Sequence, residues 1–398
     1  MRRFLLLFLV LLLCCIPLAA RLRTIDLVPS ATLLIPYWET DPFDPDGVDT
    51  LVTIQNASAT AVVAHVTVWT DYGIPTTTFD FYLTGYDQET FSMRAAMNRV
   101  VPITADDGDD PADTISPQGM LSQDINYPGI HVFPETCTPP NIHLVHMGVS
   151  TPEYFSGLCA ARNYNDVIAR GYLTIDTVNQ FNTDTPASPG YFAGLVTHQN
   201  VLLGEVTFLD RPRGRIYTEP AVHIEAAQSS DYPAFPPGTF TFYGRFVGQT
   251  GVDQREALPT AWAGVWAGNR TEIEYWRDPG VAVSPFACGG APPFTLDERQ
   301  IRAFNESGGT VATSAGDPFP RAAGVTPGGA QLGLTSGFGW LFMNLNLPAP
   351  NGPQNDIRQS WITMRNVPRD QPTGSAMGYA AHGIQLGNSM NPDNPVKP

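Results

Sequence analysis

The sequence predicts an all-β fold in which antiparallel strands build two β-sandwich domains after a signal peptide. Two observations lead to this prediction. Short segments alternate apolar and polar residues with the period of two that a strand requires. The 37 prolines and 36 glycines break the chain into short pieces, and no long helical period is present. Many short strands separated by turn residues are typical of a sandwich.

The clearest alternation lies between Val62 and Leu83. Apolar residues occupy every second position from Val62 to Val68, a turn follows, and Phe79, Phe81 and Leu83 repeat the pattern. Every feature of this stretch is explained by strand formation. His65, on the opposite face of the first strand, is expected to be a packed or surface histidine, because nothing near it in sequence completes a catalytic triad.

The same pattern continues to the end of the chain. It predicts an upstream strand over residues 51–56 and later strands at 171–178, 201–209, 221–226, 239–247, 271–276, 299–304, 339–345, 360–364 and 382–386. A short helix is possible at 142–147, where the helical and extended interpretations fit equally well.

The first twenty residues have the layout of a secretory signal peptide. Arginines at the start are followed by an apolar run from Phe4 to Ile16 and by Ala19 and Ala20. The run is short for a permanent membrane helix, although an uncleaved anchor stays open. We therefore expect residues 1–20 to be removed and the mature chain to be secreted, periplasmic or at the cell surface, and not an integral membrane protein.

The remaining chain is long enough for two domains. We expect a first sandwich over residues 24–227 with an irregular insertion at 102–170, a linker at 228–238 rich in proline and small residues, and a second sandwich over 239–398. The segments TLVTIQN, AVVAHVTVW, GYLTIDTV and VLLGEVTFL in the first half are followed in the second by TEIEYW, RQIRAF, GWLFMNL and SWITM. This order suggests an internal duplication, although alternating strands also resemble one another by chance.

Several segments together resemble a group of uncharacterised secreted bacterial proteins with immunoglobulin-like β-sandwich domains. They are NASATAVVAHVTVWTD, YLTGYD, ARGYLTIDTVN, AVHIEA and REALPTAW. The resemblance covers most of the mature chain and implies export and a sandwich architecture. It brings no activity and no catalytic residue.

The charge of the chain limits its partners. The formal net charge is −16, which argues against nucleic acid and anionic lipid because both need a positive surface. Cations, proteins and glycans remain. We expect a protein or glycan of the cell envelope or exterior as the partner.

The strongest metal candidate is the stretch ETDPFDPDGVD. Its aspartates, Asp41, Asp44, Asp46 and Asp49, surround a proline and a glycine, as carboxylates do in calcium loops, but the full EF-hand spacing is missing. Aspartate and glycine also make ordinary turns, which is the alternative. The denser acidic cluster at 106–113 is expected to be a solvated loop. Calcium is the only cofactor that the sequence suggests, with a structural role.

Glu272 and Glu274 are the candidate catalytic pair. They share one face of a predicted strand next to Trp276, as the acid and base of a glycosidase on a jelly-roll sheet could. The alternative is that this face is solvated, with Ile273 and Tyr275 turned inward.

Three cysteines remain after the signal peptide. Cys137 and Cys159 are close in sequence, and we expect them to form a disulfide in an oxidising compartment, with Cys288 left over. A zinc site with His143 and His146 is the alternative, but the spacing matches no familiar pattern.

No constellation of residues identifies a reaction. The sequence favours an exported non-catalytic protein that binds, adheres or has a structural role in the envelope. The alternative is a secreted glycan-active hydrolase on a jelly-roll scaffold. Two carboxylates facing each other across an aromatic-lined cleft would favour the enzyme.

Overall fold

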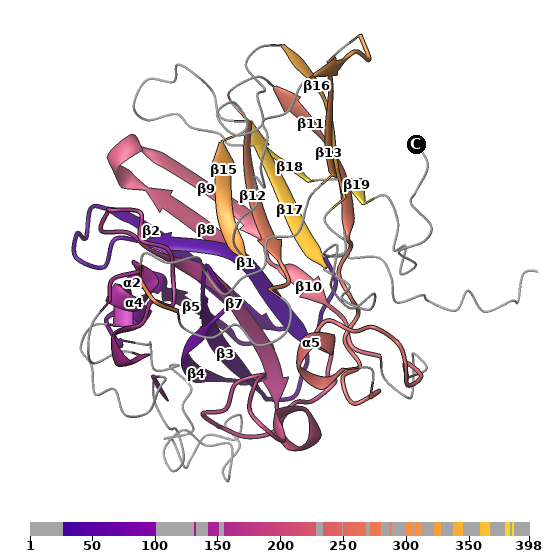
Figure 1. Cartoon of the computed structure of the whole chain (residues 1–398). Helices are drawn as coiled ribbons and strands as arrows, with labels where there is room; N and C mark the ends of the chain where they lie inside the picture. Colours follow the sequence, from indigo (N-terminus) through magenta and orange to yellow (C-terminus); the bar gives the residue numbers. More distant parts are fainter. Residues whose placement is uncertain are drawn as a thin grey trace, which may run out of the picture.

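The computed structural model confirms an all-β protein built from four antiparallel sheets (Figure 1). The structure describes residues 27–100, 131–132, 142–150, 155–227, 234–248, 250–267, 271–279, 286–288, 300–305, 307–311, 322–327, 337–344, 359–366, 379–382 and 384–385. The predicted signal peptide, the acidic cluster at 106–113 and Cys137 lie outside these residues.

Two sheets come from the first half of the chain. A six-stranded sheet has the order β10-β1-β7-β3-β4-β6, and a four-stranded sheet has the order β5-β2-β8-β9. They face each other, because the rings of Phe79 and Phe81 in the larger sheet lie 5.4 and 5.3 Å from that of Phe91 in the smaller one. The strands are β1 (Thr32–Thr40), β2 (Val48–Asn56), β3 (Val62–Thr70), β4 (Pro75–Leu83), β5 (Gln88–Ser92), β6 (His131–Val132), β7 (Ala169–Val178), β8 (Leu202–Asp210), β9 (Arg215–Pro220) and β10 (Val222–Ile224).

Two further sheets come from the second half. Their orders are β14-β13-β16-β11-β19 and β15-β12-β17-β18. Leu341 and Met343 of the larger sheet share one buried cluster with Ile273 and Ile362 of the smaller. The strands are β11 (Ala261–Ala267), β12 (Thr271–Arg277), β13 (Gln300–Asn305), β14 (Thr310–Val311), β15 (Ala323–Pro327), β16 (Phe338–Asn344), β17 (Ser360–Asn366), β18 (Tyr379–His382) and β19 (Ile384–Gln385).

The described strands of the two halves have the same topology. We number the described strands of each half from one to nine in chain order, leaving out β6. The larger sheet then has the strand order 9-1-6-3-4 in both halves. The smaller sheet runs fifth, second, seventh, eighth in both. The four pairs of segments that suggested a duplication occupy matching places: β2 with β12, β3 with β13, β7 with β16 and β8 with β17. The duplication is therefore confirmed at the level of topology.

One glycine in each half supports this equivalence at the residue level. A Cβ atom on Gly171 of β7 would lie 2.0 Å from the carbonyl oxygen of Trp69 on β3. A Cβ atom on Gly339 of β16 would lie 1.7 Å from the carbonyl oxygen of Phe304 on β13. Both distances are far below van der Waals contact, so only glycine lets the two strands approach this closely. The same local constraint thus recurs on the sixth strand of each sandwich.

The hydrophobic core does not stop between the halves. Each sheet takes its strands from only one side of residues 228–238, but Leu258, Trp276 and Ala322 belong to the buried cluster of the first sandwich. The division into two separate domains at that linker stays a prediction.

The helices are short, and one of them replaces a predicted strand. Residues 239–247 were expected to be extended, but they form turns and α5 (Gly244–Val247). The undecided segment at 142–147 is helical as α4 (Ile142–His146). The other helices are α2 (Met93–Met97), η1 (Phe155–Gly157), η2 (Tyr191–Leu195) and η3 (Arg211–Arg213).

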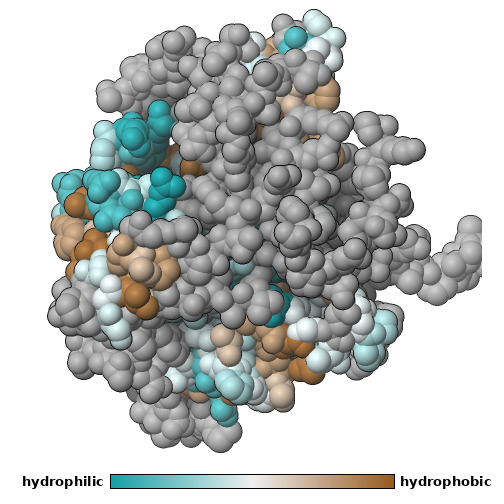
Figure 2. Space-filling model, viewed as in Figure 1, coloured by the Kyte–Doolittle hydropathy of each residue, from teal (hydrophilic) through white to brown (hydrophobic). Residues whose placement is uncertain are grey.

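The candidate sites lie near the β8–β9 hairpin. Figure 2 shows hydrophilic side chains gathered on the side of the molecule where this hairpin and the turn after β1 project in Figure 1. Both elements contribute polar groups to the sites below.

Candidate functional site

The aspartates predicted as calcium ligands lie in the turn between β1 and β2, which uses their carboxylates. Asp41 Oδ1 accepts hydrogen bonds from the backbone N–H groups of Phe43 and Asp44, at 2.9 and 3.1 Å. Asp44 accepts one from the N–H of Asp46 at 2.9 Å. Aspartates stabilise turns by such contacts. The ordinary-turn interpretation accounts for these bonds.

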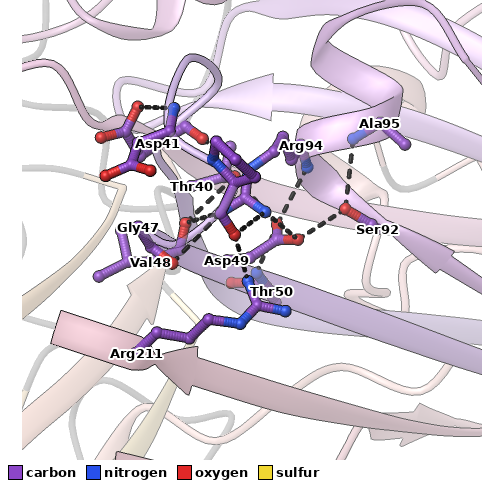
Figure 3. Close-up of polar contacts among 12 residues, drawn as sticks. Thr40, Asp41, Gly47, Val48, Asp49, Thr50, Ser92, Arg94, Ala95 and Arg211 are labelled. Carbon is purple, nitrogen blue, oxygen red and sulfur yellow. Dashed lines mark hydrogen bonds and ion pairs between the residues drawn. The ribbon is translucent and has the colours of Figure 1, made fainter. Parts of the chain in front are cut away.

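Arg94 of α2 fills the role that a cation would have in this turn (Figure 3). Its Nε donates to the carbonyl of Asp41 at 2.8 Å and its Nη1 to that of Pro45 at 3.1 Å. Its Nη2 donates to the carbonyls of Gly47 and Val48 at 3.3 and 3.0 Å. A calcium loop collects carbonyl and carboxylate oxygens around one ion. Here a single guanidinium collects four carbonyls.

Asp49 is held by the same group of residues. Its buried carboxylate accepts hydrogen bonds from the hydroxyls of Thr40 and Ser92, at 2.9 and 2.7 Å, and from the backbone N–H of Arg94 at 3.0 Å. Arg94 Nη1 also lies 3.6 Å from Asp49 Oδ2. In the described part of the chain, no group of three or more His, Cys, Asp or Glu side chains could hold a metal ion. The structure therefore does not bring the four aspartates together as calcium ligands.

This geometry predicts that calcium does not stabilise the turn. We expect the same melting temperature in millimolar calcium and in a chelator, compared at equal ionic strength. A ligand at about 100 times its Kd that binds only the folded state would add roughly 2.7 kcal/mol. A calcium-dependent rise in melting temperature that disappears in Asp44→Asn would contradict this interpretation.

Glu272 and Glu274 share one face of β12, as the alternation predicts, but their environments differ. Glu274 is fully buried, and its carboxylate is bonded to Arg365 on β17. The same guanidinium nitrogen donates to Glu219 of β9 at 3.1 Å. Arg365 therefore joins carboxylates from the two halves. Glu272 is only partly buried and lines a cleft.

The expectation that this face of β12 is solvated is wrong for Glu274 and for Trp276, because the first half of the chain covers it. Trp276 is buried, with its ring 6.0 Å from that of Tyr172 and 5.6 Å from that of Phe242. It is not exposed as a platform for a sugar.

The cleft next to Glu272 has a volume of about 170 Å³ and lies between the halves. Its walls come from β1, β8 and β9 of the first half and from β12, β15 and β17 of the second. Tyr37, Phe208 and Tyr217 form an aromatic column along it, with successive ring centroids 6.5 and 4.7 Å apart. The guanidinium of Arg365 lies 4.3 Å from the Tyr217 ring centroid. A cleft with aromatic walls and a few polar groups is a common form of ligand site.

Some polar groups of the cleft are already paired. Asp210 forms an ion pair with Arg213 at 2.9 Å. Glu39 accepts a hydrogen bond from the Tyr37 hydroxyl at 2.9 Å and lies 3.8 Å from Arg170. These contacts hold the side chains that line the cleft in place. Other polar groups of the cleft remain able to bind a ligand.

Three polar groups remain available. In the described part of the chain, the side chains of Glu272 and Arg215 make no hydrogen bond and no ion pair. The Tyr217 hydroxyl accepts a hydrogen bond from Arg365 at 2.6 Å, so its own proton is free to be donated. Burial raises the pKa of Tyr217 despite the opposing effect of Arg365, and the phenol therefore stays protonated. The cleft thus offers one anionic acceptor, one cationic donor and one hydroxyl donor.

The predicted Cys137–Cys159 disulfide is wrong, because Cys159 is bonded to Cys288. The partner is 129 residues away in sequence, but a β-bridge brings it close. The backbone groups of Cys159 and Phe286 exchange hydrogen bonds of 2.8 and 2.9 Å. Cys288 is therefore not left over, and Cys159 is not a thiolate that could bind zinc.

The two histidines of the zinc alternative have separate structural roles. His143 packs its ring 4.8 Å from that of Phe43. His146 contacts the Thr76 hydroxyl at 2.8 Å and the Arg170 carbonyl at 2.9 Å. Burial lowers the pKa of His146 to about 4, so it is neutral over most of the pH range.

His65 is a packed histidine, fully buried beside the carboxylate of Asp80. Its Nδ1 lies 2.7 Å from the carboxylate of Asp80 on β4, and its Nε2 lies 2.8 Å from the carbonyl of Asp184. A carboxylate and a carbonyl both accept hydrogen bonds, so this environment favours the doubly protonated ring, although burial also raises the pKa of Asp80. Burial alone would lower the pKa of His65, but attraction to Asp80 and the two hydrogen bonds overcome it and raise the pKa. Asp176 adds to this attraction.

This pair predicts a pH-dependent stability. The folded state keeps the His65 proton at pH values where the unfolded state has lost it, so the stabilisation is complete below about pH 6.5 and disappears as the pH rises through the folded-state pKa. We expect the free energy of unfolding in urea to be higher for wild type than for His65→Gln. The difference should be largest at pH 6 and become progressively smaller up to pH 9. His143→Gln is the control, because burial lowers its pKa and reverses the trend. Parallel curves for wild type and His65→Gln would contradict the assignment.

Comparison with known proteins finds no matching family model, curated protein or solved structure. The immunoglobulin-like resemblance of the sequence therefore stays a prediction. Within the described residues, none of the helices has the length and apolar character needed to cross a membrane.

Proposed function

We propose that this chain is an exported, non-catalytic binding protein that holds a component of the cell envelope or exterior in the cleft between its halves. The observation that carries the proposal is the convergence of Glu272, Arg215 and the Tyr217 hydroxyl on one aromatic-lined cleft. Uncommitted donors and acceptors at a junction between two folded units are what a polar ligand requires. The predicted signal peptide and the acidic composition support a partner outside the cytoplasm.

One observation favours the second candidate, a secreted glycan-active hydrolase. Glu39 of β1 and Glu272 of β12 line the same cleft from different halves. Paired carboxylates flanking an aromatic cleft are the arrangement that glycoside hydrolysis uses. This pair would replace Glu272 and Glu274, because Glu274 is bound to Arg365. We prefer the binding function because the Glu39 carboxylate is already engaged by Tyr37 and lies near Arg170.

Co-sedimentation with cell-envelope fractions of the producing organism tests the proposal. We expect Glu272→Gln and Arg215→Gln each to weaken binding about tenfold, the loss of roughly one charged hydrogen bond. Glu205→Gln is the matched control, because Glu205 is exposed on β8 and does not line the cleft.

Two outcomes would contradict the binding function. Equal binding by wild type and both cleft variants would remove the cleft as the site. Release of soluble sugar from the fractions, lost in both Glu39→Gln and Glu272→Gln, would establish the hydrolase in place of the binder.

A further inference from the structure

The topological match between the halves identifies equivalent surface positions. Tyr172 follows the constrained glycine of β7, and Trp340 follows the constrained glycine of β16. On the neighbouring third strand, Trp69 lies opposite Tyr172, and Phe304 lies opposite Trp340. Each sandwich therefore has an aromatic pair at the same place in its larger sheet.

In the first half this aromatic pair is completely covered. Trp69 and Tyr172 are 1% and 0% exposed. The cover includes Trp276 of β12, whose ring lies 6.0 Å from that of Tyr172, and residues of α5, which follows the first sandwich in the chain. The Arg245 guanidinium lies 5.3 Å from the Trp69 ring centroid and donates to the Tyr172 hydroxyl at 3.2 Å. The Phe246 ring lies 5.9 Å from that of Trp69.

In the second half the equivalent face is open. Trp340 is 49% exposed and Phe338, on the same strand and face, is 53% exposed. Val265 of β11 lies beside Trp340 and is 46% exposed. Phe304 completes the group and is partly buried. Exposed apolar side chains that form a contiguous group on one sheet face mark interaction surfaces.

We propose that this aromatic face, defined by Val265, Phe304, Phe338 and Trp340, is a docking surface for a segment of another protein that presents an arginine followed by an aromatic residue. The first half shows how such a segment is bound. There the arginine lies over an indole ring and is also paired with Asp278 at 3.1 Å, and the adjacent phenylalanine packs against the same indole. Cation–π attraction, an ion pair and hydrophobic burial thus act together. The surface is separate from the cleft, so the proposal does not depend on the cleft's function.

The chain's own α5 segment provides the probe. A labelled synthetic peptide of residues 240–250, FTFYGRFVGQT, contains Arg245 and Phe246 in their natural order. We expect it to bind the full mature protein, and Trp340→Ala to weaken that binding at least tenfold in fluorescence anisotropy. A peptide with glutamine in place of Arg245 should bind wild type with a similar loss. Phe43→Ala is the matched control, because Phe43 is 58% exposed on the turn after β1.

Each further outcome decides against the proposal. Absence of peptide binding up to millimolar concentration, or equal binding by wild type and Trp340→Ala, would overturn the docking surface. Sedimentation velocity provides a separate test of the occupant. A dimer of the wild type that dissociates in Trp340→Ala would assign the face to a second copy of this chain, and the partner proposed here would be wrong.

Discussion

Replacing both Cys159 and Cys288 with serine should lower the free energy of unfolding by about 4–5 kcal/mol. The disulfide joins residues 129 apart, so its removal gives the unfolded chain much more freedom, and the chain-entropy model predicts a large effect for so long a loop. Removing the disulfide also takes away the covalent link next to the β-bridge between Cys159 and Phe286. Urea unfolding at equilibrium, without reductant, measures the difference from wild type.

Cys137→Ser is the control for this experiment. It should leave the unfolding free energy close to that of wild type, because Cys159 already has its partner in Cys288. Peptide mapping without reduction should recover Cys159 linked to Cys288. The assignment fails if Cys137→Ser is as destabilised as the double variant.

Replacing Arg94 with alanine should cost about 3 kcal/mol. The substitution leaves the carbonyls of Asp41, Gly47 and Val48 without this donor and removes the positive charge beside buried Asp49. Losing several hydrogen bonds to partly buried acceptors, together with the charge that faces a buried carboxylate, is among the larger sources of destabilisation by single substitutions. The decrease should appear as a lower urea midpoint with an unchanged slope.

Two variants make the Arg94 experiment specific. Arg94→Lys keeps the charge but cannot donate in the planar fork that reaches several carbonyls, so most of the loss should remain. Arg211→Ala should cost less than about 1 kcal/mol, because Arg211 is exposed and, among the described residues, donates one hydrogen bond, to the Pro45 carbonyl of this turn at 2.8 Å. A lysine variant as stable as wild type would show that charge alone is sufficient.

The strands that sequence alone could predict are those with one polar face or a clear turn on each side. β3, β4, β7 and β8 follow their alternation closely. β1 is missing from the prediction, because its sequence TLLIPYWET contains consecutive apolar residues and does not alternate. It also contains Pro36, which lies where the β1–β7 register shifts between Ile35 and Trp38. A bulge is the position in a sheet where proline is tolerated.

The alternating segment at 239–247 was predicted to be a strand, but it forms turns and α5. Phe242 and Tyr243 are both buried, and their rings contact Trp276 and Phe192. The apolar residues of this segment pack against other elements although the segment is not a strand. A period of two over so few residues does not distinguish a packed turn from a strand. Which of these side chains are buried depends on contacts with residues that are distant in sequence.

The candidate site was predictable only in part, for the same reason. The cluster of aspartates at 41–49 was interpreted as a calcium loop or an ordinary turn, and sequence could not show that the side chain of Arg94, from another element, contacts the carbonyls of this turn. Alternation correctly placed Glu272 and Glu274 on one face, but Arg365 and the first half decide which of them is buried. Arg215 and Tyr217 carry no motif, and the β9 strand that positions them was not predicted.

The cover over the first sandwich has a consequence for biosynthesis. Asp176 of β7 is buried and accepts a hydrogen bond from the Tyr243 hydroxyl at 2.7 Å, and Arg255 lies 3.3 Å from it. Both partners follow the last strand of that sandwich. Since a ribosome makes the chain from its N-terminus, the nascent first half lacks two of the groups beside Asp176, the Tyr243 hydroxyl and the Arg255 guanidinium. It also lacks the α5 residues that pack on Trp69 until they have been synthesised. Cys159 likewise cannot form its disulfide until Cys288 has been synthesised. Complete burial of the first sandwich therefore depends on residues beyond 227, and we expect a translation product that stops there to leave part of its apolar surface exposed.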